Sequence, residues 1–330
     1  MSGFTLSGLG TFTVEDKAGL KRKSVYGAVS MDLFTIYEGI KYSEKLPYLT
    51  TQPAMQAYAT CASINPSGDG GTLAQITLTV DTFSFQDSWC LRQLEIKYAQ
   101  KYLKKGTNYD ENSAPELINA ILEDYSARQA KIYEMAVWQS SKTQNGFNTN
   151  LKQFNGFIQT LTTLGGFVNQ QTVAGTAYTS ITTANVLTIL DNQWLATPAD
   201  IKRSDDLVTC MGDDTFDKMI IALKNANNYN WTATSADAGS RSITYPGTTM
   251  KIVAVPGLNA DNDSNLPAAF KNRIITFQKD NYIVGTDLIS DENDIDMWYE
   301  KKEDLIYYRN IMKMTTGIFF PEFTVSFATV

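Results

Sequence analysis

The last third of the chain constrains the fold most, because short apolar runs follow one another there like the strands of a sheet. Most of these runs are flanked by Gly, Pro, Asn or Asp, which end strands and begin turns. They occupy residues 250–256, 273–277, 281–285, 297–302, 304–312 and 323–327. The sequence therefore predicts that strands build most of this part of the chain.

A long amphipathic helix is predicted at residues 113–138. Ser113 and Glu116 have the spacing of a capping box, and Pro115 is tolerated in the first turn, where its missing N–H would have no partner. Apolar residues then recur mostly at steps of three and four residues. About 28 residues make a helix about 40 Å long at roughly 1.5 Å per residue. This length favours a spine, although an ordinary core helix would give the same apolar stripe.

A projecting β-hairpin is predicted within residues 58–85. Ile76, Leu78 and Val80 alternate there with polar residues, after a turn-rich stretch at residues 65–71. The candidate residues of the hairpin tip are Asn65, Gly68, Gly70 and Gly71. Glycine adopts backbone angles that other residues rarely adopt, so it suits a tight tip. The stretch lacks the GxxxxGK[ST] pattern of a phosphate-binding loop.

The middle of the chain predicts one α/β layer. A buried-type strand at residues 206–212 is followed by a helix, which Asp213 or Asp214 is expected to cap. The strand at residues 250–256 would complete the layer. A second helix is predicted within residues 183–202, because its apolar residues share one broad face.

In two segments the apolar residues recur with neither the helical nor the strand period. Residues 1–50 are interpreted as an extended arm with one helix near residues 31–38. Residues 225–248 are rich in Asn, Ser, Thr and Gly, which predicts an irregular excursion over the surface.

The composition excludes several classes of enzyme and compartment. The chain has no histidine, which rules out Ser-His-Asp and Cys-His nucleophiles and histidine-bearing zinc sites. Cys61, Cys90 and Cys210 are odd in number and widely spaced, so we predict reduced, buried thiols. The sequence has neither the pattern of a signal peptide nor a run of about 18 apolar residues. We expect a protein that is made and kept in a cytoplasm, with no membrane partner.

Two acidic stretches are the candidates for a metal site. Residues 261–265 begin like a calcium loop, but Leu266 and Asn272 stand where the loop requires Gly and Glu. The second stretch comprises Asp291, Glu292, Asp294 and Asp296. A metal-dependent hydrolase could use such a cluster, but a solvated turn explains it more simply. We therefore predict no catalytic residue, no metal and no cofactor.

The order of these elements resembles that of the major capsid protein of tailed bacteriophages, whose architecture is called the Hong Kong-type or Johnson fold. The hairpin around residues 61–69 is similar to the extended loop of that family, and residues 113–138 to its spine helix. Residues 206–223 and 250–285 are similar to its axial domain, and residues 297–327 to a return to its peripheral domain. The combination is most similar to capsid proteins of crAss-like gut phages.

The resemblance implies an α+β fold with a defined division of the chain. An N-terminal arm would occupy residues 1–50 and an extended β-hairpin loop residues 51–90. The peripheral domain with the spine helix would comprise residues 91–145 and 286–330, and the axial domain residues 146–285.

The resemblance also implies a structural protein that is not an enzyme. Such a protein self-assembles into pentamers and hexamers, which form the icosahedral shell of a virion around double-stranded DNA. The hairpin tip would then lie at a contact between subunits. Implied partners are portal, scaffolding and auxiliary capsid proteins, with assembly in the host cytoplasm. A net charge of −7 suits a shell that lies beside packaged DNA without sequence-specific binding. An encapsulin-like compartment shell and a tail tube or sheath protein are the structural alternatives.

Overall fold

A computed structural model describes most of the 330-residue chain. The residues that it does not describe are 1–28, 52, 56–69, 91–112, 145–147, 227–240, 288–294, 301, 304 and 330. In the long helix, side chains are described from Tyr125 onward. The described part is a mixed α+β fold with a six-stranded sheet, a five-stranded sheet and a two-stranded hairpin.

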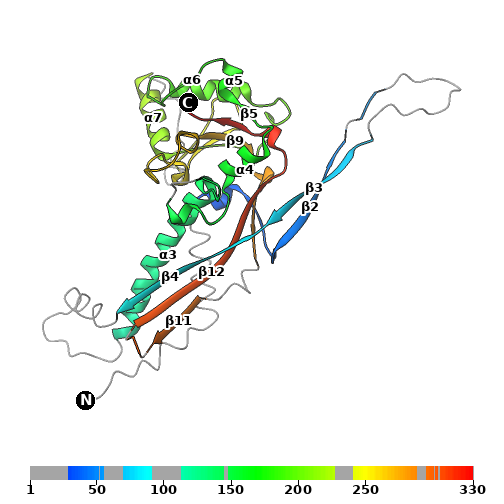
Figure 1. Cartoon of the computed structure of the whole chain (residues 1–330). Helices are drawn as coiled ribbons and strands as arrows, with labels where there is room; N and C mark the ends of the chain where they lie inside the picture. The colour runs from blue at the N-terminus through cyan, green and yellow to red at the C-terminus, as the bar shows by residue number, and fades with distance from the viewer. Residues whose placement is uncertain are drawn as a thin grey trace.

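The six-stranded sheet forms the core of the body at one end of the molecule (Figure 1). In sheet order, its strands are β5 (Val168–Asn169), β13 (Val325–Phe327), β9 (Ile274–Gln278), β6 (Leu207–Met211), β8 (Lys251–Ala254) and β7 (Ser242–Thr244). Strands β6 and β8 are parallel, and helix α7 (Asp213–Asn225) connects β6 to the segment before β7. The predicted α/β layer is confirmed.

Two apolar clusters cover the two faces of this sheet. Leu207 and Met211 lie in one cluster with residues of α6 (Val186–Ala196) and α7. Val208 and Cys210 lie in the other cluster, which also contains Trp138. The alternation along β6 follows from the two-residue period of a strand.

The five-stranded sheet, called here the long sheet, extends away from the body beside the long helix (Figure 1). Its strands are β1 (Thr35–Tyr37), β10 (Tyr282–Thr286), β12 (Leu305–Ile318), β11 (Ile295–Glu300) and β4 (Asp81–Cys90). Strand β12 pairs with the full length of β4 on one side, and with β11 and then β10 on the other.

Helix α3 (Ser113–Gln139) packs on one face of the long sheet. The rings of Tyr125 and Tyr308 lie 4.8 Å apart, and those of Tyr133 and Phe85 lie 5.4 Å apart. The predicted helix at residues 113–138 is confirmed almost to the residue. The side chains of the predicted capping box lie outside the described residues.

The hairpin consists of β2 (Ser43–Thr50) and β3 (Thr72–Thr79) and projects from the body (Figure 1). Its outgoing strand lies upstream of the run that was predicted to begin at residue 58. It also begins before residue 51, where the extended loop was predicted to start. Strand β4, predicted as part of that loop, belongs to the long sheet instead. The division into named domains stays a prediction.

Three local predictions are wrong. No α-helix forms at residues 31–38, because a short 3-10 helix, η1 (Val29–Leu33), is followed by β1, which pairs with β10. The predicted irregular excursion contains β7 among its described residues. Helix α7 is not capped by an aspartate, since its N-cap is Gly212.

The hydrogen-bond acceptor for the first backbone N–H of α7 comes from a residue distant in the sequence. The side-chain oxygen of Asn259 accepts the backbone N–H of Asp213 at 2.6 Å. Asp213 and Asp214 lie in the first turn of the helix, where negative charge is favourable beside the helix dipole. Their presence at the helix start was predicted, and their role as the cap was not correct.

Candidate assembly surface

The base of the hairpin is anchored to the body through one of its two faces. Leu46 and Leu78 are buried there in a small cluster with Ile40 and Ile283. Further out on this face, the ring of Tyr48 lies 5.3 Å from that of Phe320. The inner part of the hairpin is therefore held by side-chain packing, which its two strands alone could not provide.

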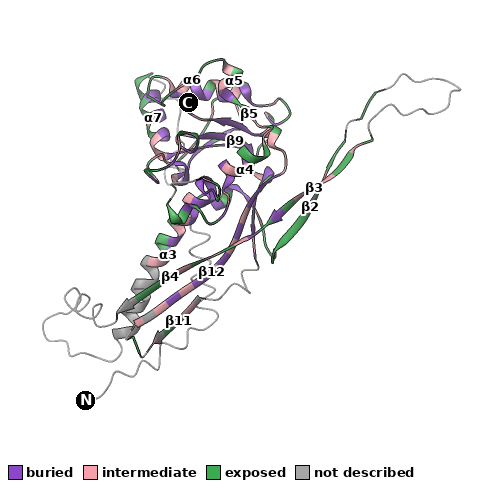
Figure 2. Ribbon diagram, viewed as in Figure 1, coloured by how far each residue is buried: buried purple, intermediate pink, exposed green. Residues whose placement is uncertain are grey.

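The opposite face of the hairpin carries an apolar pair that no described residue covers. Leu49 and Leu73 are directly opposite each other across the two strands. Their side chains are 63% and 74% exposed. Met55, near the tip, is fully exposed. Figure 2 shows that exposure dominates the outer part of the hairpin.

The hairpin also offers unpaired backbone edges. In the described part of the chain, β2 and β3 pair with each other and with no other strand. An exposed edge with apolar side chains is a template for pairing or packing with another chain. The hairpin is thus the segment of the described structure that is best suited to contact a partner.

Two of the four predicted tip residues can be placed. Gly70 and Gly71 directly precede β3 and have φ angles of 68° and 100°. A Cβ atom on Gly71 would lie 2.9 Å from Cγ2 of Thr51, so the returning strand also needs glycine for lack of space. Asn65 and Gly68 lie outside the described residues. A role of the four residues in assembly stays a prediction.

A second group of exposed apolar side chains lies on the outer helices of the body. These residues are Leu164 on α4 (Phe157–Leu164), Val173 on α5 (Gln170–Ala174), Leu195 on α6, and Ile220 and Ile221 on α7. Single exposed apolar residues are common on protein surfaces, so this group is weaker evidence for a contact than the paired leucines of the hairpin.

One described carboxylate in each of the two candidate metal loops already has partners in the protein. The carboxylate of Asp263 accepts backbone N–H groups of Asn148 at 2.7 Å and Asn265 at 3.0 Å. Asp296 forms an ion pair with Arg309 at 2.6 Å. Among the residues that the structure describes, no three His, Cys, Asp or Glu side chains converge as a metal site would require. Asp291, Glu292 and Asp294 fall outside that part.

No helix within the described ranges is long and apolar enough to cross a membrane.

The leucine pair was not predicted from the sequence. Lys45, Pro47 and Leu49 alternate with Leu46 and Tyr48, which is a weak strand signal around a proline. Without the identity of the pairing strand, Leu49 could not be assigned to a face, and its position opposite Leu73 could not be inferred.

The fold is shared with proteins of phage shells. No protein-family model and no curated protein sequence matches the chain. A chain of the Gordonia phage Cozz structure matches with a TM-score of 0.59 and 11% identity, over 92% of this chain and 86% of that one.

Two further solved structures show the same likeness. A chain of the procapsid of satellite phage P4, a structure that includes the size determination (Sid) protein, has a TM-score of 0.53 and 12% identity, covering 96% of this chain and 100% of that one. A chain of the capsid of Myoviridae phage XM1 has a TM-score of 0.53 and 13% identity, covering 91% and 90%. The chain therefore has the fold of phage capsid proteins, which confirms the predicted fold class.

Proposed function

We propose that this chain is the major capsid protein of a tailed phage, the repeating subunit of an icosahedral shell around double-stranded DNA. The observation that carries the proposal is the projecting hairpin with its uncovered leucine pair, on a body whose fold is that of phage capsid proteins. Exposure of this leucine pair to water is unfavourable in a monomer. The hairpin gains stability when a neighbouring subunit covers it.

The physics of repeated contacts supports a closed shell. One hairpin on each subunit, meeting a different surface of the next subunit, gives a head-to-tail contact that closes into rings where the rotation permits. Pentamers and hexamers are such rings. Many modest contacts then combine, so the particle is stable even though each contact is weak.

The remaining partners follow from the same proposal. The net charge of −7 suits a shell that surrounds DNA without holding it tightly or reading its sequence. Portal, scaffolding and auxiliary capsid proteins would complete the virion, after assembly in the host cytoplasm. The most specific part of the proposal is that the phage belongs to the crAss-like group. No sequence match supports this part.

The proposal is tested by the assembly state of the purified protein and of a hairpin variant. We expect the wild type to form rings of five or six subunits, or closed shells, in light scattering after size exclusion and in negative-stain images. The double substitution L49S/L73S removes the apolar pair from an exposed face, so the subunit should fold and remain unassembled. Circular dichroism and the midpoint of thermal unfolding check the fold.

The matched control is K45S/T77S, which changes a polar pair directly opposite each other on the same face of the same hairpin. This control should assemble like the wild type. Normal shells from L49S/L73S, or a wild type that is a monomer at every concentration, would contradict the proposal. Filaments would point to a tail tube or sheath, and shells that enclose a cargo enzyme to a compartment.

A further inference from the structure

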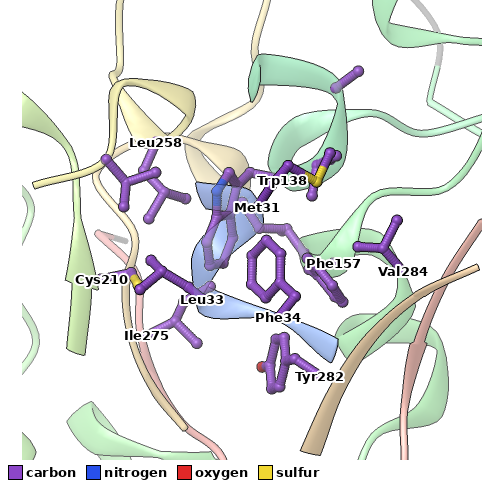
Figure 3. Close-up of a cluster of buried hydrophobic side chains, with 14 of the residues drawn as sticks. Met31, Leu33, Phe34, Trp138, Phe157, Cys210, Leu258, Ile275, Tyr282 and Val284 are labelled. Atoms are coloured by element: carbon purple, nitrogen blue, oxygen red, sulfur yellow. The ribbon is translucent and has the colours of Figure 1, made fainter. Parts of the chain in front are cut away.

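A short segment before β1 fills the junction between the two large sheets. This segment, residues 29–34, is called here the strap. The ring of Phe34 lies 6.0 Å from Phe277 on β9 of the six-stranded sheet and 6.3 Å from Tyr282 on β10 of the long sheet. It also lies 5.2 Å from Trp138 and 4.6 Å from Phe157. Figure 3 shows Phe34 among Trp138, Phe157 and Tyr282, with Met31 and Leu33 beside it.

One polar group anchors the strap to α3. The backbone N–H of Ser30 donates to the carboxylate of Glu134 at 3.0 Å, and the Ser30 hydroxyl donates to the same carboxylate. The Ser30 hydroxyl in turn accepts the indole N–H of Trp138 at 2.8 Å. The backbone N–H of Gly257, in η4 (Pro256–Leu258), is a further donor to Glu134. The strap, α3 and η4 thus meet at one carboxylate.

The anchor is a buried carboxyl group that is held by hydrogen bonds. Glu134 is 5% exposed and forms no ion pair with any described residue. The ionisable groups around it are Asp213 at the start of α7, Cys210 on β6, and Lys131 and Asp261, which line a cavity of about 340 Å³ with it. Burial raises the pKa of Glu134, while the hydrogen bonds from Ser30 and Gly257 oppose that rise.

The strap contributes side chains to the core but takes little part in the strand ladders. Its residues precede β1, and β1 itself pairs with β10 through three residues. The strap pairs with no strand of the six-stranded sheet. A segment that contributes side chains to a core, but little to the strand ladders, can leave that core while the ladders persist.

We propose that the strap is a removable wedge that fixes the angle between the two sheets, with Ser30, Glu134 and Trp138 as the latch that holds it. When the strap is seated, Phe34 fills the space between β9 and β10 and prevents the sheets from moving relative to each other. When it leaves, this space is empty and the body can rotate on the long sheet.

The charge of Glu134 sets the direction in which pH acts on the latch. In the seated state the carboxyl is buried and its pKa is raised, whereas in the open state water surrounds it and its pKa is ordinary. The seated state therefore binds the proton more tightly. Seating is favoured at acid pH and becomes weaker as pH rises through the raised pKa.

Hydrogen exchange of the strap tests the latch. Ser30→Ala removes the hydroxyl from Glu134 and leaves the Trp138 N–H without its acceptor. We expect amides of the strap to exchange about tenfold faster, with amides of β9 unchanged. The control is Ser140→Ala, since Ser140 is equally buried but its hydroxyl has no hydrogen-bond partner among the described residues. Unchanged strap exchange in Ser30→Ala, or equal acceleration in β9, would overturn the proposal.

The wild type and Glu134→Gln test the pH effect without relying on Ser30→Ala. After correction for intrinsic exchange rates, the wild-type strap should open more at pH 7.5 than at pH 5. Glu134→Gln, which cannot ionise, should lose this difference. The opposite slope in the wild type, or the same slope in both proteins, would exclude Glu134 as the group responsible.

The angle between the sheets is measured by the distance between two spin labels. The two labels are attached to cysteines introduced at the exposed positions Thr82 on β4 and Leu195 on α6. Cys61 and Cys90 are replaced by serine in this protein. The wild type should give one narrow distance distribution, and Ser30→Ala a broader one. An equally narrow distribution in a variant whose strap exchanges faster would show that the strap does not lock the sheets.

Discussion

Gly257 lies where η4 crosses α3 so closely that no side chain fits between them. A Cβ atom at this position would be 2.3 Å from the backbone oxygen of Glu134 and 2.6 Å from Cδ1 of Trp138. The backbone oxygen belongs to a helix and cannot move aside. The close approach also brings the Gly257 N–H to the Glu134 carboxylate, so this glycine supports the latch as well as the packing.

Gly257→Ala should therefore lower the free energy of unfolding by about 3 kcal/mol or more, because relief of the overlap requires η4 to separate from α3. Urea unfolding followed by tryptophan fluorescence measures the change. The control is Gly247→Ala, where φ is 73° and no atom lies within 4 Å. That substitution adds backbone strain alone, about 1 kcal/mol. Equal losses in the two variants would mean that the crossing is not as tight as described.

Among single residues, the buried thiol of Cys210 was predicted from the sequence, and the pairing of Ser30 with Glu134 was not. Cys210 was predicted as a buried thiol, and it is fully buried on β6, where burial raises its pKa well above the ordinary value. The prediction rested on the odd number and wide spacing of the three cysteines, of which Cys61 and the side chain of Cys90 lie outside the described residues. The pairing of Ser30 with Glu134 could not be inferred, since the two residues are 104 positions apart and neither carries a distinctive pattern.

At the scale of elements, the hairpin depends on glycine where its returning strand begins. The positive φ angles of Gly70 and Gly71 are strained for a side chain with a Cβ atom, and Gly71 is crowded by Thr51 as well. Because the base of the hairpin is anchored separately through Leu46 and Leu78, damage near the tip should not reach the body.

The double substitution Gly70→Val and Gly71→Val should consequently prevent shell formation and leave the subunit folded. Electron microscopy scores the shells, and the midpoint of thermal unfolding should stay within about 2 °C of the wild type, as expected for a change outside the core. Thr72→Val is the control, since it places valine on the adjacent strand residue without a positive φ angle. Normal shells from the double variant would count against a role of the tip in assembly.

Over the whole molecule, the two large sheets share one apolar cluster, whereas the outer hairpin shares none. The shared cluster contains Val208 and Phe277 from the six-stranded sheet, Val284 and Met312 from the long sheet, and Trp138 from α3. The outer hairpin beyond its base has no such cover. The free subunit should therefore be stable in its body and open to solvent along the hairpin.

Assembly should reduce this difference between hairpin and body, because a neighbouring subunit would cover the hairpin. We expect backbone amides of residues 48–51 and 70–75 to exchange at least about tenfold more slowly in assembled shells than in free subunits, because a covered edge no longer contacts water. Amides of β6 and β9 serve as the internal control and should exchange equally in both states. Hydrogen exchange with mass spectrometry on the two forms measures both sets. Equal exchange of the hairpin in both forms would contradict burial of the hairpin by a neighbour.

The elements of this protein were largely determined by the sequence itself. The three- and four-residue steps of residues 113–138 predict α3, and the β6, α7 and β8 succession is visible in the change of period along the chain. Periodicity is a local property, because it reflects which face of one helix or strand meets the core. The order of such elements was also enough to suggest the capsid fold.

Tertiary structure alone decided which distant segments meet. It paired β2 with β3, which leaves Leu49 opposite Leu73, and it placed Phe34 between Phe277 and Tyr282. Residues 35–37 form a strand because they pair with β10, whereas the sequence predicted a helix there. These outcomes depend on the free energy of contacts between remote residues, and no window of neighbouring residues contains that information.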